Sequence, residues 1–222
     1  MFNSLNDNDL NKLERKFGHL AIPNLMQIIV IAMVAVYVLD MFSLPVSRGA
    51  GISQLIAFSR SAILSGQIWR VISFVFMPPA TSPIFLLVTL YFFWMIGHSL
   101  ELNWGSFRFT LYYLIGVLGT IIGGFITGYA SNYYLNLSLF IAFAIFNPNM
   151  EVLLFFILPL KIKYLAYFSA ASLLYMFIIS GWAGKVSILV SLLNLFLFFG
   201  DDFINSIRNI IRRIKWKLET RQ

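Results

Sequence analysis

The chain of 222 residues has no cysteine, only two histidines and few charged residues, which make up 11% of its length. Without cysteine it can form no disulfide and no cysteine-ligated metal site, and it has no thiolate nucleophile. With so few charges it cannot cover a soluble globule of this size with polar side chains. Residues 1–20 are polar and charged and lack the short apolar core of a cleavable signal peptide. We therefore expect the first membrane span to target the chain.

Apolar residues make up 59% of the chain and occur in runs separated by short polar breaks. Mean hydropathy is +0.83. Because a helix satisfies its own backbone hydrogen bonds inside lipid, this pattern predicts an all-α, polytopic membrane protein. We expect six transmembrane helices, at 24–44, 84–100, 109–129, 133–146, 164–180 and 186–199.

Two of these runs, 133–146 and 186–199, would reach only about 21 Å across a hydrocarbon core of about 30 Å. Neighbouring helices should bury their ends, or the bilayer should thin around them. A seventh apolar piece, 152–160, is too short to cross and contains Pro159. We expect it to be interfacial or re-entrant.

An even number of spans puts both ends of the chain on one side of the membrane. Of the sixteen Lys and Arg residues, all but Arg48, Arg60, Arg70 and Lys185 then fall on the side of the termini, which predicts cytoplasmic termini. The expected organisation is a cytoplasmic segment (1–23), a six-helix membrane domain (24–200) and a basic tail (201–222). The tail is either an amphipathic helix on anionic lipid or a simple anchor. Because the net charge of +7 is largest beside the membrane, it does not indicate nucleic-acid binding.

The connection at 45–83 is the longest in the chain and is expected on the outer side. Much of it is apolar, so it should pack against the membrane or the helix bundle. Trp69 suits the headgroup region, and Arg70 beside it can bond phosphate or backbone carbonyls.

The second span ends in an unusual segment, "IGHSLELNWGSFRF", at 96–109. Gly97 and Gly105 each lie one turn from Glu101, so these residues share a helix face, and the two glycines permit close backbone approach. An ionisable group near a span end needs a partner, which for Glu101 could be loop amides or Arg108.

Together with Trp69 and Arg70, this segment resembles the rhomboid superfamily. In that family a Trp-Arg pair occupies a large first outer loop, and the second span ends in G-x-x-x-E-x-x-x-G-[ST], matched here by Gly97, Glu101, Gly105 and Ser106. The resemblance covers roughly 66–200 and implies a six-helix rhomboid-like bundle. The sequence "FNPN" at 146–149, followed by an apolar, basic segment, is also similar to derlins, the branch without protease activity.

An active rhomboid carries a serine in G-x-S-G at the start of span four, a histidine base in span six, and His and Asn helpers on span two. This chain departs at each place. Ser131 and Ser138 lack the flanking glycines, Asn194 stands where the base is expected, and Phe85 and Thr89 stand at the helper positions. His98 would lie about one bilayer away from the start of span four. We therefore reject Ser131, Ser138 and His98 as catalytic residues.

Other glycine positions predict contact between helices, and other polar positions predict a cleft within the bundle. Gly119 and Gly123 form a G-x-x-x-G spacing, which favours helix contact. Asn136, Ser138, Ser191 and Asn194 could line an emptied active-site cleft and bind client segments. No pattern for a cofactor or a metal is present.

We expect a rhomboid-like pseudoprotease that lacks the histidine base needed for cleavage and that binds transmembrane segments of other proteins. Its partners would be the lipid bilayer and those segments, and amino-acid usage favours a bacterial plasma membrane. A degenerate intramembrane serine protease is the alternative. A small transporter or channel is a second alternative, although charged residues within the spans are nearly absent.

Overall fold

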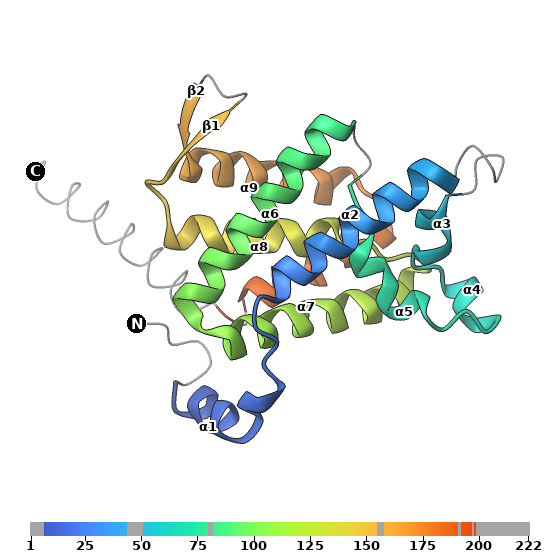
Figure 1. Cartoon of the computed structure of the whole chain (residues 1–222), viewed down its shortest axis with the longest axis horizontal. Coiled ribbons are helices and arrows are strands. Elements are labelled where there is room, and N and C mark those ends of the chain that lie inside the picture. Colours follow the sequence, from blue (N-terminus) through green and yellow to red (C-terminus); the bar gives the residue numbers. More distant parts are fainter. Residues whose placement is uncertain are drawn as a thin grey trace, which may run out of the picture.

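The computed structural model (Figure 1) describes residues 7–43, 51–79, 82–154, 158–190, 192–196 and 198. The tail at 201–222, expected to be amphipathic, and Ser191 lie outside the described residues. The elements, in chain order, are α1 (Asp7–Phe17), η1 (Gly18–Leu20), α2 (Leu25–Ser43), α3 (Ile52–Ile56), α4 (Arg60–Leu64), α5 (Arg70–Ser73), η2 (Phe74–Phe76), α6 (Pro83–Trp104), α7 (Ser106–Thr127), α8 (Tyr133–Phe146), β1 (Glu151–Leu154), β2 (Leu158–Lys161) and α9 (Ile162–Ile179). A further helix, Trp182–Phe196, follows α9.

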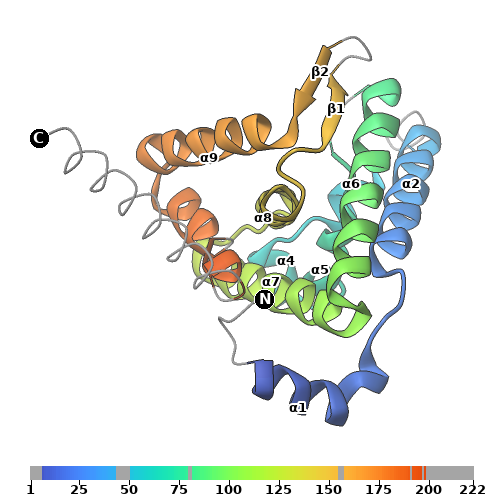
Figure 2. The ribbon, with the colours of Figure 1, turned by 90° about the vertical axis from the view of Figure 1, so that its left-hand side faces the viewer.

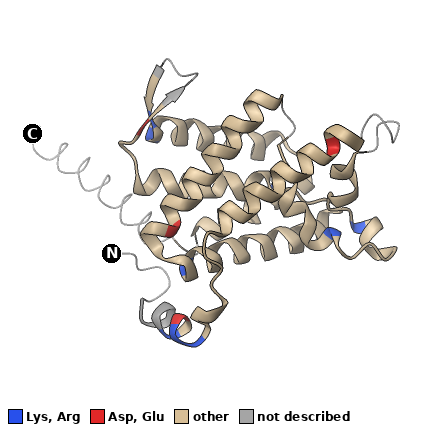
Figure 3. Ribbon diagram, in the orientation of Figure 1, with Lys and Arg blue, Asp and Glu red and all other residues tan. Residues whose placement is uncertain are grey.

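Four helices are long and apolar enough to cross a membrane, and they contain α2, α6, α7 and α9. The two shorter apolar helices, α8 and Trp182–Phe196, are the ones for which the sequence predicts short spans. Among the described residues, Lys, Arg, Asp and Glu gather toward the two ends of the bundle, and its middle is uncharged (Figure 3). The chain is therefore a helical membrane protein, and six remains the predicted number of spans.

Within the segment 152–160, expected to be interfacial or re-entrant, the described residues belong to two β-strands. Strand β1 pairs antiparallel with β2, with Glu151 opposite Lys161 and Leu153 opposite Pro159. Proline is tolerated in a two-stranded sheet because each strand has a free edge. The described part of the chain is thus mostly helical, with a two-stranded antiparallel sheet that the all-α expectation omits.

Helix α8 lies at the centre of the bundle. Viewed along the bundle in Figure 2, α8 is seen end-on, with α6, α7 and α9 around it and α2 outside α6. Eight of its fourteen residues are buried. A helix that is apolar on every side is expected at such a position.

The connection at 45–83, which we call the first loop, packs through its described residues against the far end of this bundle. The sequence predicts packing against either the membrane or the bundle, and contacts with the bundle are present. The ring of Phe58 is 1% exposed and lies where a Cβ on Gly124 of α7 would come within 2.7 Å of it. It makes edge-on contacts with Phe74 and Phe125, at centroid distances of 5.8 and 5.5 Å. The carboxylate of Asp40, at the end of α2, accepts hydrogen bonds from the backbone N–H and the hydroxyl of Ser53. The loop is therefore fixed at both α2 and α7.

Candidate functional site

A pocket of about 600 Å³ lies between α6, α8 and α9, and we call it the lateral groove. Helices α6 and α9 flank it and α8 forms its floor (Figure 2). Its lining, taken together, is Met77, Pro78, Pro79, Phe92, Phe93, Ile96, Ser131, Asn132, Tyr133, Asn136, Leu137, Phe140, Leu165, Phe168 and Ser169. These described lining residues are mostly aromatic or aliphatic, with a few uncharged polar groups, which is the usual character of a binding pocket.

Asn136 is the most informative polar residue of the lateral groove. Its side chain is 6% exposed, and its Oδ1 atom is buried without a hydrogen-bond partner. A buried amide oxygen without a partner costs about 1–3 kcal/mol. A bound molecule that donates a hydrogen bond to this oxygen would recover that cost.

Asn132 joins the lateral groove to the first loop. Its amide nitrogen donates to the carbonyl oxygens of Val75, at 3.0 Å, and Met77, at 2.8 Å. The end of the loop at Met77–Pro79 therefore stands beside the start of α8, where it lines one end of the groove.

Ser138 and Asn194, expected in the same cleft as Asn136, instead meet at α7. At about 100° per residue, positions 136 and 138 lie on nearly opposite faces of α8. The Ser138 hydroxyl donates to the carbonyl of Leu135 at 2.7 Å and lies 3.1 Å from the Tyr112 hydroxyl. The Asn194 amide donates to the backbone carbonyl of Tyr112 at 3.2 Å. Neither residue is among those that line the lateral groove.

The other catalytic candidates are widely separated. Ser131 lines the lateral groove, and its hydroxyl accepts a hydrogen bond from the Tyr133 N–H at 3.2 Å. His98 is exposed on α6, where its ring stacks on Trp94 with centroids 5.6 Å apart. Because α6 ends at the α6–α7 turn while α8 begins after α7, His98 and Ser131 lie toward opposite ends of the bundle. The second histidine, His19, is exposed in η1.

The two helper positions on α6 do not face the lateral groove. The Thr89 hydroxyl bonds the carbonyl of Phe85 in its own helix at 2.8 Å, and the Phe85 side chain is exposed. The α6 residues that reach the groove are Phe92, Phe93 and Ile96.

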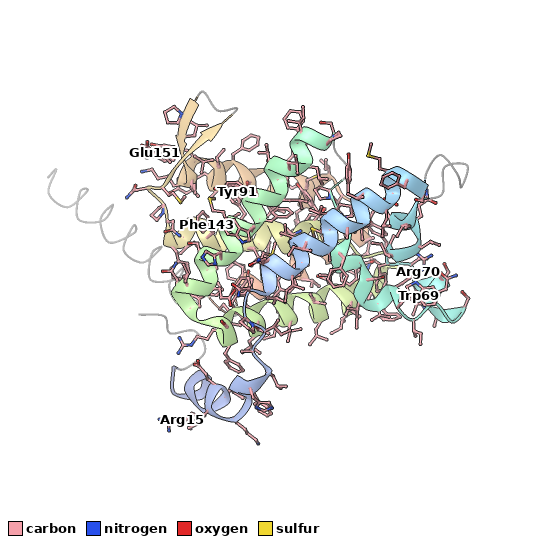
Figure 4. The ribbon with its side chains drawn as sticks, viewed as in Figure 1. Arg15, Trp69, Arg70, Tyr91, Phe143 and Glu151 are labelled. Atoms are coloured by element: carbon pink, nitrogen blue, oxygen red, sulfur yellow. The ribbon has the colours of Figure 1, made fainter. Side chains whose placement is uncertain are left out.

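Arg70 holds the first loop together from within. It is 8% exposed, and its guanidinium donates to the carbonyls of Gln54, at 2.6 Å, and Ala57, at 2.8 Å. It also donates to the side-chain oxygen of Gln67 at 2.6 Å. The sequence predicts that Arg70 bonds phosphate or backbone carbonyls, and bonds to backbone carbonyls are present. Trp69, beside Arg70 in Figure 4, is half exposed and donates from its indole nitrogen to the Leu55 carbonyl at 3.2 Å.

Glu101 ties α6 to the start of α2 and to α7. One of its carboxylate oxygens accepts the Asn24 N–H at 2.9 Å and the Ser106 hydroxyl at 2.6 Å. A backbone amide was one of its expected partners. Arg108, the other expected partner, has its Nε 3.8 Å from a carboxylate oxygen of Glu14 in α1.

The glycines serve different purposes. A Cβ on Gly97 would lie 2.3 Å from the Cβ of Met26, so this glycine permits α2 and α6 to touch. At Gly105 the expectation of close backbone approach is wrong, because a Cβ there would meet nothing within 4 Å. Its φ of +82° is instead the feature that requires glycine, since it allows α7 to start directly after α6. Gly119 and Gly123 face Val190 of the last helix.

Sequence reasoning missed the aromatic walls of the lateral groove and the role of Asn132. The spacing of Phe92, Phe93 and Ile96 resembles ordinary core packing, so no signal in the sequence separates them from other apolar residues. Asn132 stands at the N-cap position of α8, but its side chain makes no capping hydrogen bond there, so a helix-start signal would not have predicted its contact with the loop.

A second pocket, of about 410 Å³, lies between α8, α9 and the helix Trp182–Phe196. The described residues that line it are all apolar, so it offers no group to orient a ligand. No group of three or more His, Asp or Glu that could hold a metal occurs among the described residues. In comparisons with known proteins, the chain matches no family model and no curated protein.

Proposed function

We propose that this chain is a rhomboid-like membrane pseudoprotease that holds transmembrane segments of other proteins in the lateral groove without cleaving them. The observation that carries the proposal is the buried, unpartnered amide oxygen of Asn136 in a pocket between two apolar helices. In lipid, a polar group of this kind favours a partner that brings its own hydrogen-bond donor. A membrane-embedded segment with a polar side chain or a free backbone N–H supplies one.

The walls of the groove also suit such a client. Phe92 and Phe93 come from α6, Phe140 from α8 and Phe168 from α9. Aromatic and aliphatic side chains give a helix surface extensive van der Waals contact, which drives helix association in lipid where the hydrophobic effect is absent.

The proposal that clients are not cleaved rests on the surroundings of the two serines. Serine proteases of this kind need a neutral base within hydrogen-bond reach of the hydroxyl. The neighbour of Ser138 is the Tyr112 hydroxyl, and a phenol is protonated near neutral pH. The neighbour of Ser131 is a backbone N–H, which has no lone pair to accept a proton.

Photocrosslinking from inside the groove tests client binding. A benzophenone amino acid would replace Phe93 or Leu137, which line the groove, and in matched controls it would replace Leu87 on α6 or Leu118 on α7. Both control side chains are exposed on the outside of the bundle, at 65% and 57%. We expect membrane-protein adducts from the groove positions in excess of the controls. Equal yields from all four positions would reject the groove as the client site.

A degenerate protease is a second candidate because Ser131 lines the groove. The purified protein would be incubated with a model transmembrane substrate in liposomes. Cleavage by the native chain that disappears in Ser131→Ala would replace the pseudoprotease proposal with a protease. The Ser138→Ala variant serves as the control, since Ser138 faces α7.

A further inference from the structure

Helix α1 lies apart from the rest of the molecule. In both views it stands outside the bundle, below the start of α7 (Figures 1 and 2). Only seven residues separate its last residue, Phe17, from the first residue of α2, Leu25. Because α2 is long and apolar enough to cross a membrane, α1 must lie close to the bilayer surface.

One face of α1 is apolar and partly exposed. Leu13 and Phe17, one turn apart, are 39% and 38% exposed, and Leu20 in η1 is 59% exposed. Exposed apolar side chains at this spacing form the kind of stripe that an interfacial helix buries between headgroups and acyl chains.

The opposite face is polar and carries Arg15. At about 100° per residue, Arg15 lies opposite the midpoint between Leu13 and Phe17. Figure 4 shows Arg15 on the side of α1 turned away from the first loop, which is at the far end of the bundle. The apolar face is therefore turned toward the level of the membrane spans, and Arg15 is turned away from it.

Lys12 and Lys16 lie between these two faces, at the height where an interfacial helix meets headgroups. Both are exposed, and the ammonium of Lys16 lies 5.4 Å from the centroid of the Phe17 ring. A lysine stem along an apolar surface with its charge at the edge is the geometry of a side chain that reaches for phosphate. Asp7 and Asp9 lie in the first turn of α1, and a carboxylate oxygen of Glu14 lies 3.8 Å from Arg108 Nε.

We propose that α1 is an interfacial helix that binds an anionic bilayer surface, with Leu13 and Phe17 immersed and Lys12 and Lys16 on lipid phosphates. The ion pair between Glu14 and Arg108 sets the rotation of the helix, because it fixes one flank to α7. This inference is independent of the client-binding proposal, since it concerns the opposite side of the molecule from the lateral groove.

The absence of cysteine makes the test direct, because a single introduced cysteine labels one site. Spin labels at Leu13→Cys, Phe17→Cys and, as the matched control, Arg15→Cys would be compared in the full chain in nanodiscs. One set of discs would hold phosphatidylcholine alone and the other would include phosphatidylglycerol. Power saturation with oxygen and with a water-soluble nickel chelate reports the depth of each label.

With phosphatidylglycerol present, we expect the labels at 13 and 17 to collide mainly with oxygen and the label at 15 mainly with nickel. In phosphatidylcholine alone, and in the Lys12→Gln/Lys16→Gln background, labels 13 and 17 should become shallower. Labels at 13 and 17 that are as accessible to nickel as the label at 15 would overturn the proposal. A depth that is equal in both lipids would overturn the anionic part of it.

Discussion

The two walls of the lateral groove are built differently. The α6 wall is held by α2 through Gly97 and by the Glu101 carboxylate, which bonds the chain just before α2. The α9 wall has no glycine and only two buried residues, Ile162 and Leu173. In the apolar windows of these helices, 28% of α6 is buried against 11% of α9.

This difference shows that α9 is the less firmly packed wall. Within lipid, helices associate through close packing and hydrogen bonds, because lipid tails are as apolar as the helix surface. The α6 wall has both kinds of interaction, whereas α9 has little packing. We therefore expect a client to enter by displacement of α9 while α6 stays in place.

The largest effect is expected at the contact that fixes the α6 wall. In Gly97→Ala the new Cβ would lie 2.3 Å from the Met26 Cβ, and neither atom can rotate away. Helices α2 and α6 must separate, at a cost of about 3 kcal/mol in the free energy of unfolding. Thermal unfolding in mild detergent measures this loss.

The control for this variant is Gly181→Ala, where an added Cβ meets nothing within 4 Å. Met26→Gly in the Gly97→Ala background should restore much of the lost stability. A Gly97→Ala protein as stable as the control would show that the α2–α6 contact is not close.

The next effect is expected at Glu101. Glu101→Ala leaves the Asn24 N–H and the Ser106 hydroxyl without their acceptor and should cost about 2 kcal/mol. Glu101→Gln keeps one oxygen acceptor and should cost less. Hydrogen exchange of the Asn24 amide, together with unfolding in detergent, measures both changes. The matched control is Glu14→Ala, whose exposed ion pair should contribute less than about 1 kcal/mol.

Inside the groove, a substitution at Asn136 should stabilise the protein, whereas the substitutions above destabilise it. Asn136→Leu removes a buried oxygen that has no partner and should raise the free energy of unfolding by about 1 kcal/mol. It should also lower the yield of client adducts from Phe93. Asn132→Leu is the contrast, because it loses two hydrogen bonds to the first loop and should be destabilising. A stable Asn136→Leu protein with undiminished adducts would remove Asn136 from the client site.

The smallest effect is expected where α7 meets the last helix. In Gly119→Ala the nearest atom is a γ-methyl group of Val190, at 2.8 Å, which can shift by rotation of its side chain. We expect a loss of about 0.5 kcal/mol, measured by the same thermal unfolding. A loss as large as that of Gly97→Ala would mean that this side of the bundle is packed as tightly as the α2–α6 side.

For several site residues the sequence predicts the kind of hydrogen bond but not the residue that makes it. The Trp69–Arg70 pair in an apolar loop indicated an arginine that bonds carbonyls, and Glu101 at a span end indicated an acid that bonds amides. The tertiary structure decides which carbonyl and which amide they bond. Arg70 bonds the Gln54 carbonyl, and Glu101 bonds the Asn24 amide. Such contacts between distant residues have no local signature.

Other features were ambiguous in the sequence for a physical reason. The apolar piece at 152–160 fits a hairpin as well as a membrane-dipping segment, because a short apolar run carries no clear period. Asn136 and Ser138 looked like one polar cleft, although helical geometry puts them on opposite faces of α8.

The sequence by itself determined that this is a helical membrane protein, because composition and the length of apolar runs decide whether a chain is stable in lipid. It also determined which helices are short and where charged groups must find partners. Only the tertiary structure decided that α6 and α9 enclose a groove and that Asn136 faces it while Ser138 faces Tyr112. A helix in lipid is apolar on most of its sides, so the faces that contact one another are chosen by packing, which a hydrophobic pattern does not encode.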